Sequence, residues 1–218
     1  MISLAEENYL KAIFHLSRGG DGPVTTNELA ESMHTKAASA TDMIKRLAAK
    51  SLISYEKYHG VELTNYGKTE ALAIVRKHRL WETFLVNKLG FTWDEVHDVA
   101  EQLEHIQSPL LIEKLDAYLG HPTADPHGHT IPDKHGKMKE PKQLPLSEST
   151  KGISATVTSV RNSTSAFLQY LDKLGITIGT EIVVEDKVAF DGSMAVVVDR
   201  KKKVTLSKET SENILVAK

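Results

Sequence analysis

The sequence predicts an α+β protein of three modules: a winged helix-turn-helix, an all-α domain and a small β-barrel of SH3 type. Three observations lead to this prediction. They are a helix, turn, helix and hairpin pattern near the N-terminus, a helical block in the middle, and alternating apolar residues near the C-terminus. We place the modules at residues 1–69, 70–142 and 150–218, with an irregular connector over 121–145. A chain of 218 residues has room for two or three such modules.

The N-terminal module begins with an amphipathic helix over residues 4–17, whose apolar residues recur at helical spacing. A glycine-rich turn ends this helix. Thr26 has the character of an N-cap before a short helix over 27–33, and Thr35 starts a second helix that runs to about Lys50.

Two short apolar runs, Leu52–Tyr55 and Val61–Leu63, flank a turn at His59 and Gly60 and predict a β-hairpin. This completes the order of a winged helix-turn-helix, in which the second helix enters the major groove of DNA. The residues expected to point from that helix toward DNA are Lys36, Ser39, Thr41, Asp42, Lys45 and Arg46. A small helical domain with a solvated polar face is the alternative, because residues 24–68 carry nearly balanced charges.

Residues 70–119 form a helical block of three segments, in which Thr92 caps the second and Pro109 precedes the third. Its large apolar residues are Leu80, Trp81, Phe84, Leu85, Leu89, Leu110, Leu111, Ile112, Leu115 and Leu119. Three short helices cannot bury so many among themselves, so we expect a dimer interface. Packing of this surface on the N-terminal module is the alternative.

Histidines and carboxylates cluster on the first two segments of this block. Spacings of three and four residues bring side chains over one another on a helix. The residues at such spacings are His97, Glu101, Glu104 and His105 on one segment, and His78 and Glu82 on the segment before it. Metal sites in helix bundles are built in this way. We therefore expect these residues to bind a metal, whereas exposed polar residues on amphipathic helices are the alternative.

Two enzyme motifs come close but are incomplete. An inverted zincin helix needs histidine where this chain has Glu101, and a di-iron helix needs glutamate where it has Gln102. The sequence also contains no HExxH, no Gly-rich phosphate loop and no serine or cysteine nucleophile motif. The cluster therefore indicates a binding site more than an active site. A small metallohydrolase and a metal-independent interaction protein are the alternative functions.

The connector holds five of the seven prolines and four of the ten histidines, and shows no apolar periodicity. A segment of this kind is usually a flexible linker. Asp125, His127 and His129, however, place three possible metal ligands in one turn. The alternative is that the connector folds back onto the region of His78 and Glu82.

Alternating apolar residues predict five strands and one helix in the C-terminal module. The strands lie near residues 153–160, 181–184, 195–198, 204–206 and 214–216, and the helix over 166–173. The basic run Arg200–Lys203 is expected to be a solvated hairpin tip.

Composition narrows the class of protein. A formal charge of −2 neither requires nor excludes a nucleic-acid partner. The chain has no cysteine, so His, carboxylate and carbonyl groups must hold any metal. No apolar run approaches the ~18 residues of a transmembrane helix. We expect a soluble, cytoplasmic protein with no membrane partner.

Together, these parts resemble the metal-dependent transcriptional repressors of the diphtheria toxin repressor and manganese transport regulator type. The segments EENYLKAI, EKYHGVELTNYGK, RKHRL and VHDVAEQLEH, followed by the barrel, occur in the family's order and at its spacing. The resemblance covers nearly the whole chain. It implies a repressor without enzymatic activity, which forms a homodimer and binds a palindromic operator in double-stranded DNA when loaded with a divalent metal. It also implies that the barrel is of the FeoA type.

The resemblance further implies two sets of metal ligands. The family's primary site matches Asn8, Glu101, Glu104 and His105, together with His78. Its second site matches His78, Glu82 and His97 in some members, and Glu82 with Asp125 and His127 in members that respond to manganese or zinc. The barrel region that often adds a ligand, residues 162–165, contains no carboxylate.

Two departures from the family bear on the choice of metal. The iron-sensing branch has cysteine and methionine where this chain has Glu101 and Asn8. Because oxygen ligands favour hard ions, we expect Mn(II) as the activating metal and Fe(II) as the second candidate. Zn(II) and Co(II) are expected to bind in vitro. The manganese branch commonly has aspartate at Asn8, and the amide lacks that charge.

Overall fold

The computed structural model describes residues 2–56, 59–139 and 141–217. They fold into two compact units, which we call the first and the second unit. The first contains the residues up to His78, Glu101–Leu110 and Pro132–Met138, and the second contains Arg79–Ala100, Leu111–Ile131 and the residues from Lys139 on. None of the described helices is long and apolar enough to cross a membrane.

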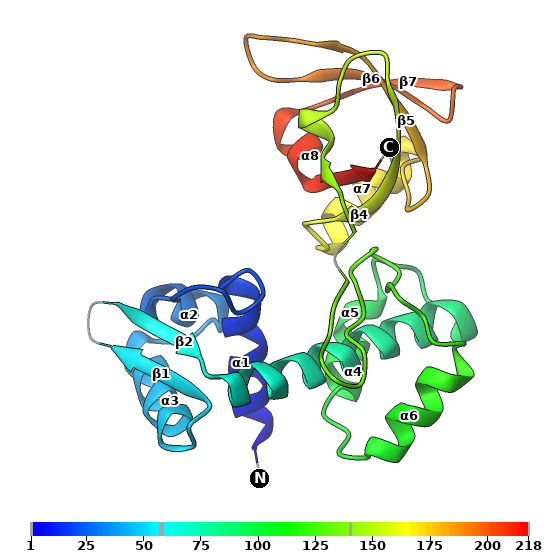
Figure 1. The fold of residues 1–218 in the computed structure, drawn as a ribbon. Coiled ribbons are helices and arrows are strands. Elements are labelled where there is room, and N and C mark those ends of the chain that lie inside the picture. Colours follow the sequence, from blue (N-terminus) through cyan, green and yellow to red (C-terminus); the bar gives the residue numbers. More distant parts are fainter. Residues whose placement is uncertain (1, 57–58, 140, 218) are drawn as a thin grey trace. The chain divides into compact units, whose positions relative to one another are not determined.

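The first unit contains the winged helix-turn-helix, and its elements follow the predicted order (Figure 1). The helices are α1 (Leu4–Leu16), α2 (Thr26–Ser32) and α3 (Ala37–Ala49), and the strands are β1 (Ile53–Glu56) and β2 (Gly60–Leu63). The strands pair antiparallel, with Ile53 opposite Leu63. Residues 57–58, next to the predicted hairpin turn, lie outside the described residues.

Both helices of the motif begin one residue away from the predicted cap. Thr25, rather than Thr26, caps α2: its hydroxyl accepts a hydrogen bond from the Glu28 backbone N–H, and the Glu28 carboxylate accepts one from the Thr25 N–H. This reciprocal pair satisfies two backbone donors at the helix start. Lys36, rather than Thr35, is the N-cap of α3 and provides no side-chain cap.

One buried cluster joins the helices of this module. Leu10 and Phe14 of α1 lie in the same core as Ile44 and Leu47 of α3. Because protein cores are close-packed, a displacement of α1 is transmitted to α3. Ile44 and Leu47 are both fully buried.

A glycine determines how the next helix leaves the wing. The Thr64 hydroxyl accepts a hydrogen bond from the Gly67 N–H, which starts α4 (Asn65–Leu89). A Cβ atom at Gly67 would overlap the carbonyl oxygen of Leu52, so any side chain here would push the helix away from the wing.

The helical block contains three helices, as predicted: α4, α5 (Val96–Leu103) and α6 (Pro109–Tyr118). However, α5 ends at Leu103, where the Ile106 N–H bonds to the Leu103 carbonyl in a tight turn. The prediction that His97, Glu101, Glu104 and His105 share one helical face is therefore wrong, because the last two lie in this turn.

The connector folds back instead of forming a free linker. In the first unit, an Arg76 nitrogen donates to the Pro132 carbonyl at 2.5 Å. In the second unit, Arg79 donates to the Thr130 carbonyl, and its Nε lies 3.7 Å from Asp125 Oδ2. Two arginines of one helix thus hold the connector, and the fold-back alternative is confirmed.

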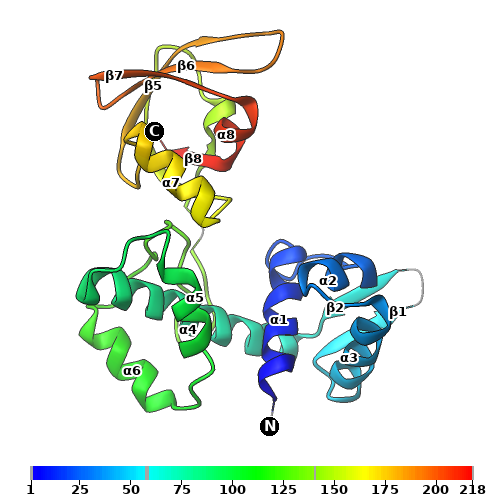
Figure 2. The same cartoon turned by 180° about the vertical axis from the view of Figure 1, so that it is seen from behind.

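The C-terminal module is a six-stranded antiparallel sheet in the order β3-β8-β4-β5-β6-β7, with α7 packed on it (Figure 2). Its elements are β3 (Leu144–Pro145), η1 (Leu146–Glu148), β4 (Ser154–Val160), α7 (Ser165–Leu174), β5 (Glu181–Lys187), β6 (Met194–Val198), β7 (Lys202–Leu206), α8 (Lys208–Asn213) and β8 (Ile214–Ala217). The five predicted strands and the predicted helix are all present. Of the basic run Arg200–Lys203, Arg200 and Lys201 lie in the exposed turn between β6 and β7, as expected for a hairpin tip, whereas Lys202 and Lys203 are exposed residues of β7 and not of the tip.

Candidate metal centres

The predicted ligands that belong to the first unit surround a buried carboxylate. Glu104 is fully buried, and its Oε2 lies 2.6 Å from His78 Nδ1. The Lys11 ammonium of α1 lies 2.7 Å from Glu104 Oε1 and 2.8 Å from Glu101 Oε1. A buried carboxylate needs such partners, because an unpaired buried charge is strongly destabilising. We call Lys11, His78, Glu101, Glu104 and His105, with Glu7, the first cluster.

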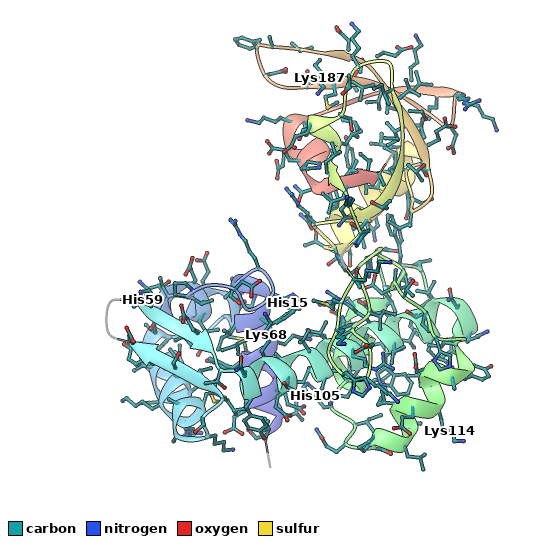
Figure 3. All side chains as sticks on the ribbon, viewed as in Figure 1. His15, His59, Lys68, His105, Lys114 and Lys187 are labelled. Atoms are coloured by element: carbon teal, nitrogen blue, oxygen red, sulfur yellow. The ribbon has the colours of Figure 1, made fainter. Side chains whose placement is uncertain are left out.

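His105 is oriented for metal binding by a residue of α1. Its Nδ1 lies 2.6 Å from Glu7 Oε2, and because a carboxylate only accepts, Nδ1 is the donor. In the neutral ring, Nε2 then carries the free lone pair, and it lies 3.8 Å from Glu104 Oε1. Figure 3 labels His105 beside α1. A histidine whose second nitrogen donates to a carboxylate is the usual arrangement around a protein-bound metal.

The surroundings of Glu104 Oε1 indicate that a cation fits between this atom and His105 Nε2. The atom is buried, and within the described part of the chain it receives no hydrogen bond of acceptable geometry, although the Lys11 ammonium is near. The Lys11 ammonium already supplies one positive charge 2.7 Å from this oxygen, and a bound cation would further stabilise the His105 Nε2 lone pair that faces it at 3.8 Å. The donor set of oxygen and nitrogen atoms suits a divalent ion.

Glu7 is a site residue that the sequence reasoning missed. It is buried, its Oε1 accepts a hydrogen bond from Gln107 at 2.7 Å, and the Lys77 ammonium lies 3.6 Å from that atom. The neighbouring Asn8, which was predicted as a ligand, is half-buried. Asn8 takes part in none of the side-chain hydrogen bonds or ion pairs found among the described residues, so its role stays a prediction.

The predicted ligands of the second unit centre on Glu82. This residue is buried, and its Oε1 lies 3.6 Å from His97 Nδ1 and 3.6 Å from His127 Nδ1. The two ligand sets implied by the resemblance therefore both place a histidine beside Glu82. We call Glu82, His97, Asp125, His127 and His129 the second cluster.

The connector supplies three residues of the second cluster. Asp125 Oδ1 accepts the backbone N–H groups of His127 and His129, at 2.8 and 2.9 Å. One ligand atom from each of these three side chains can be chosen so that all lie within 4.8 Å of one another. A group of this size can hold one metal ion.

The position of this loop is fixed by its contacts with β4. The Val160 N–H donates to the His127 carbonyl at 3.1 Å, and Gly128 has a φ of +81°. A Cβ atom at Gly128 would overlap the carbonyl oxygen of Thr158, so only glycine allows this approach.

His127 is the most deeply buried histidine of the second cluster. Its Nε2 lies 2.7 Å from the Trp93 carbonyl oxygen, and its ring stacks on the Trp93 indole. Burial alone would lower the pKa of His127, but the Glu82 and Asp125 carboxylates outweigh it and hold that pKa above the usual range. The negative charge of the two carboxylates therefore favours a cation here.

The residues predicted to contact DNA lie mainly on the exposed face of the second helix of the motif. Five are exposed: Lys36, Ser39, Asp42, Lys45 and Arg46. Thr41 is half-buried, and its hydroxyl donates to the Ala37 carbonyl at 2.8 Å. Asp42 lies 3.3 Å from the Lys45 ammonium, which offsets part of its negative charge.

The helical block presents apolar side chains at its surface. Leu110 is 64% exposed and Tyr118 is 65% exposed, and both belong to α6. Leu89 at the end of α4 is also exposed. Exposed apolar side chains mark a protein interface where they form one contiguous patch.

Three family descriptions match successive parts of the chain. Residues 1–61 match the N-terminal DNA binding domain of iron dependent repressors. Residues 64–133 match the metal binding and dimerisation domain of the same proteins, and residues 144–218 match the FeoA domain.

Whole proteins are similar over nearly the full length. The iron-dependent repressor IdeR of Mycobacterium leprae (strain TN) is 26% identical over 224 residues, which cover 97% of this chain and 96% of the relative. A solved structure described as a manganese-dependent transcriptional repressor in complex with manganese is 37% identical, with a TM-score of 0.88, and covers 97% of this chain and 98% of that chain. The structure of ScaR with bound Cd2+ is 34% identical, with a TM-score of 0.83, and covers 98% and 99%.

Proposed function

This chain belongs to the diphtheria toxin repressor family of metal-dependent transcriptional repressors, and we propose that it responds to Mn(II) and controls genes of metal homeostasis. Fe(II) is the second candidate. The relatives are repressors and not enzymes, so we set the metallohydrolase aside. The matched ranges support our division of the chain at residues 1–69, 70–142 and 150–218.

The first cluster is proposed to hold the regulatory ion. Glu104 and His105 would bind it through Oε1 and Nε2, with Glu101, His78 and the amide oxygen of Asn8 as further ligands. Glu101 and Glu104 both pair with the Lys11 ammonium. A bound divalent ion would add a second source of positive charge beside these two carboxylates. Carboxylate and amide oxygens outnumber imidazoles in this set, which favours Mn(II) over softer ions.

The observation that carries the proposal is the hydrogen bond from His105 Nδ1, in the turn after α5, to Glu7 Oε2 of α1, at 2.6 Å. It means that α1 positions the imidazole that would bind the ion. Residues of α1 and α3 lie in one buried core. The position of α1 therefore also determines the orientation of α3, the helix expected to enter the major groove. A ligand shifts such an equilibrium only through its different affinity for the two orientations.

The chain is proposed to act as a homodimer on a palindromic operator in double-stranded DNA. The two copies of α3 must then lie about 34 Å apart, one turn of the duplex. The exposed apolar residues Leu89, Leu110 and Tyr118 support an interface formed by the helical block.

The second cluster is proposed as a further metal site. Glu82, Asp125 and His127 would be its ligands, and His97 is the alternative partner of Glu82. The depth of burial of Glu82 and His127 supports the first set, because His97 is 47% exposed at its side chain.

A gel-shift titration tests the proposal. The probe is DNA from the chain's own upstream region, with and without Mn(II), and the proteins are the wild type and a Glu104→Ala/His105→Ala variant. We expect a shift that requires Mn(II) in the wild type and is lost in the variant. The matched control, Glu209→Ala/His135→Ala, removes an exposed glutamate and an exposed histidine outside the two clusters and α6, and should shift DNA like the wild type.

The proposal is wrong if the chelator-treated wild type binds the probe as tightly as the Mn(II)-loaded protein. It is also wrong if the Glu104→Ala/His105→Ala variant, shown to be folded by circular dichroism, keeps the full response to Mn(II).

A further inference from the structure

His129 is a half-buried histidine, and each of its ring nitrogens lies beside an acceptor oxygen. Its Nε2 lies 2.8 Å from the carbonyl oxygen of Val160 in β4. A carbonyl oxygen only accepts, so Nε2 carries the hydrogen and donates. In the neutral ring the lone pair is then on Nδ1, which lies 3.2 Å from Asp125 Oδ2.

A lone pair facing a carboxylate oxygen at this distance is unfavourable unless a positive charge lies between the two atoms. Asp125 cannot relieve the conflict by turning away, because its Oδ1 accepts two backbone N–H groups of the same loop. Its side chain is also fully buried, with the Arg79 Nε 3.7 Å from Oδ2. The pair of His129 and Asp125 therefore favours a cation, either a metal ion or a proton on Nδ1.

His127 repeats the same arrangement two residues earlier. Its Nε2 is fixed by the Trp93 carbonyl, and its Nδ1 faces the Glu82 carboxylate at 3.6 Å. Two histidines of one loop thus each donate Nε2–H to a backbone carbonyl and turn Nδ1 toward a carboxylate. Hydrogen bonds of this kind fix the tautomer and orientation of histidines that bind metals.

We propose that His129 is a metal ligand of the second cluster, through Nδ1, beside Asp125, His127 and Glu82. This inference rests on the proposed second metal site, whose ligands are Glu82, Asp125 and His127, and adds His129 to that set. The loop is already folded for this task, since Gly128 and Val160 fix it on β4. The side chain of His129 is 30% exposed, which gives an ion access from solvent.

The extra imidazole changes which metals the site prefers. The second site then combines two imidazoles with two carboxylates, whereas the ligands proposed for the first site are two imidazoles, two carboxylates and the amide oxygen of Asn8, a set with a larger share of oxygen. Imidazole ligands suit Zn(II), Co(II) and Fe(II), and carboxylates suit Mn(II). The second cluster is therefore expected to select borderline ions more strongly than the first.

Zn(II) binding to the full-length protein tests the assignment. Calorimetric titrations would compare the wild type, His129→Gln and the control His135→Gln, whose histidine is an exposed residue of the same connector. Glutamine keeps an N–H group for Val160 but lacks the second ring nitrogen. We expect His129→Gln to weaken one of two Zn(II) sites by about 10-fold or more, while His135→Gln leaves both unchanged.

A second measurement uses the wild-type protein, so its result does not depend on whether a variant folds. Nitrogen-15 spectra of the histidine rings, recorded during addition of Zn(II), would report the state of His129 Nδ1. We expect its resonance to move to the range of a metal-bound nitrogen without gaining a proton. The inference fails if Nδ1 is protonated in the zinc-loaded protein, or if folded His129→Gln binds both ions with wild-type affinity.

The two proposals can fail separately. Loss of one Zn(II) site in His129→Gln, combined with DNA binding that ignores metal, would remove the repressor mechanism and keep the ligand. If DNA binding requires metal but His129→Gln binds Zn(II) with unchanged affinity, the repressor mechanism stands and His129 is not a ligand.

Discussion

At the scale of single residues, Lys11 is the unexpected member of the first cluster. Its ammonium contacts both Glu101 and Glu104, which are the carboxylates proposed to bind the ion. A metal bound by these two residues therefore shares them with a fixed positive charge. Lys11 is expected to stabilise the fold and to weaken metal binding at the same time.

Lys11→Met tests both effects. We expect Mn(II) to bind at least about 10-fold more tightly, because a neighbouring unit charge at ~4 Å costs ~1 kcal/mol in water and more in a partly buried site. In the presence of a chelator the variant should unfold more easily, by up to about 3 kcal/mol, because the buried Glu104 loses the Lys11 ammonium and keeps only His78 among the partners described above. Calorimetry and thermal unfolding measure the two changes.

The control for this prediction is Lys151→Met, which removes an exposed lysine that pairs with Asp186. Exposed pairs contribute little, so neither metal affinity nor stability should change. Weaker Mn(II) binding in Lys11→Met would show that the ammonium supports the site instead of competing with the ion.

The residue types of the first cluster could be predicted from the sequence, but not all of its members. Glu101, Glu104 and His105 follow from the family motif, although Glu104 and His105 lie in the turn after α5 and not on its helical face. Glu7 had a signal that was not used: it lies at the i, i+3, i+7 positions with Leu10 and Phe14, and so on the apolar stripe of α1. A carboxylate on such a stripe needs a buried partner, and no local pattern shows that this partner is His105.

At the scale of elements, the start of α2 has a pH-dependent cap. The Thr25 N–H and hydroxyl hold the pKa of Glu28 below its usual range. A carboxylate with a lowered pKa stabilises the fold above its unfolded-state pKa, and this contribution is lost as the pH falls through the folded-state pKa.

Thr25→Val removes the hydroxyl from this cap. We expect the free energy of unfolding to fall by about 1 kcal/mol at neutral pH, the usual value for an N-cap. Protonated Glu28 is a weaker acceptor for the Thr25 hydroxyl. The difference in free energy of unfolding between the wild type and Thr25→Val should therefore shrink at acidic pH. Urea unfolding of both proteins at neutral and acidic pH measures this, and a difference that grows with acidity would contradict the assignment.

The exposed face of α6 gives a second prediction at this scale. Leu110→Glu should convert the proposed dimer to monomers, because it places a charge in the apolar contact. Sedimentation equilibrium measures the molecular mass. Leu4→Glu changes an equally exposed leucine of α1 and should remain dimeric, and dimers of Leu110→Glu would mean that the interface lies elsewhere.

Element boundaries were the part of the fold that periodicity predicted least well. The polar sequence of α8, KETSEN, has no apolar stripe, and β3 has only two residues, one of them Pro145. Both elements form because the rest of the barrel offers hydrogen bonds and a core to pack on, which is information that a local window lacks. The five longer strands alternate clearly, and all were predicted.

At the scale of the whole molecule, the proposed mechanism requires that metal and operator help each other to bind. If Mn(II) raises operator affinity by a given factor, the operator must raise Mn(II) affinity by the same factor. Fluorescence anisotropy with labelled DNA measures the first factor, and Mn(II) titration of the protein with and without operator measures the second. Unequal factors would show that metal acts through a process other than a coupled equilibrium, such as aggregation.

The three-module order was predictable at this scale, because each module has its own periodicity and the family motifs are spaced along the whole chain. The path of the connector was not. Proline-rich sequence is equally typical of a linker, and long-range contacts, such as those of Arg76 and Arg79 with its carbonyl groups, distinguish the two cases. Such contacts join residues about 50 positions apart and leave no local signal.

Gly128 has a consequence for the evolution of the protein. A single added methyl group at this position would force the loop off β4 and carry Asp125, His127 and His129 away from Glu82, while Glu104 and His105 would keep their partners. Under the proposed function, one nucleotide change could therefore convert a sensor of two ions into a sensor of one. The number of metal ions that descendants of this protein detect would then depend on whether residue 128 remains glycine.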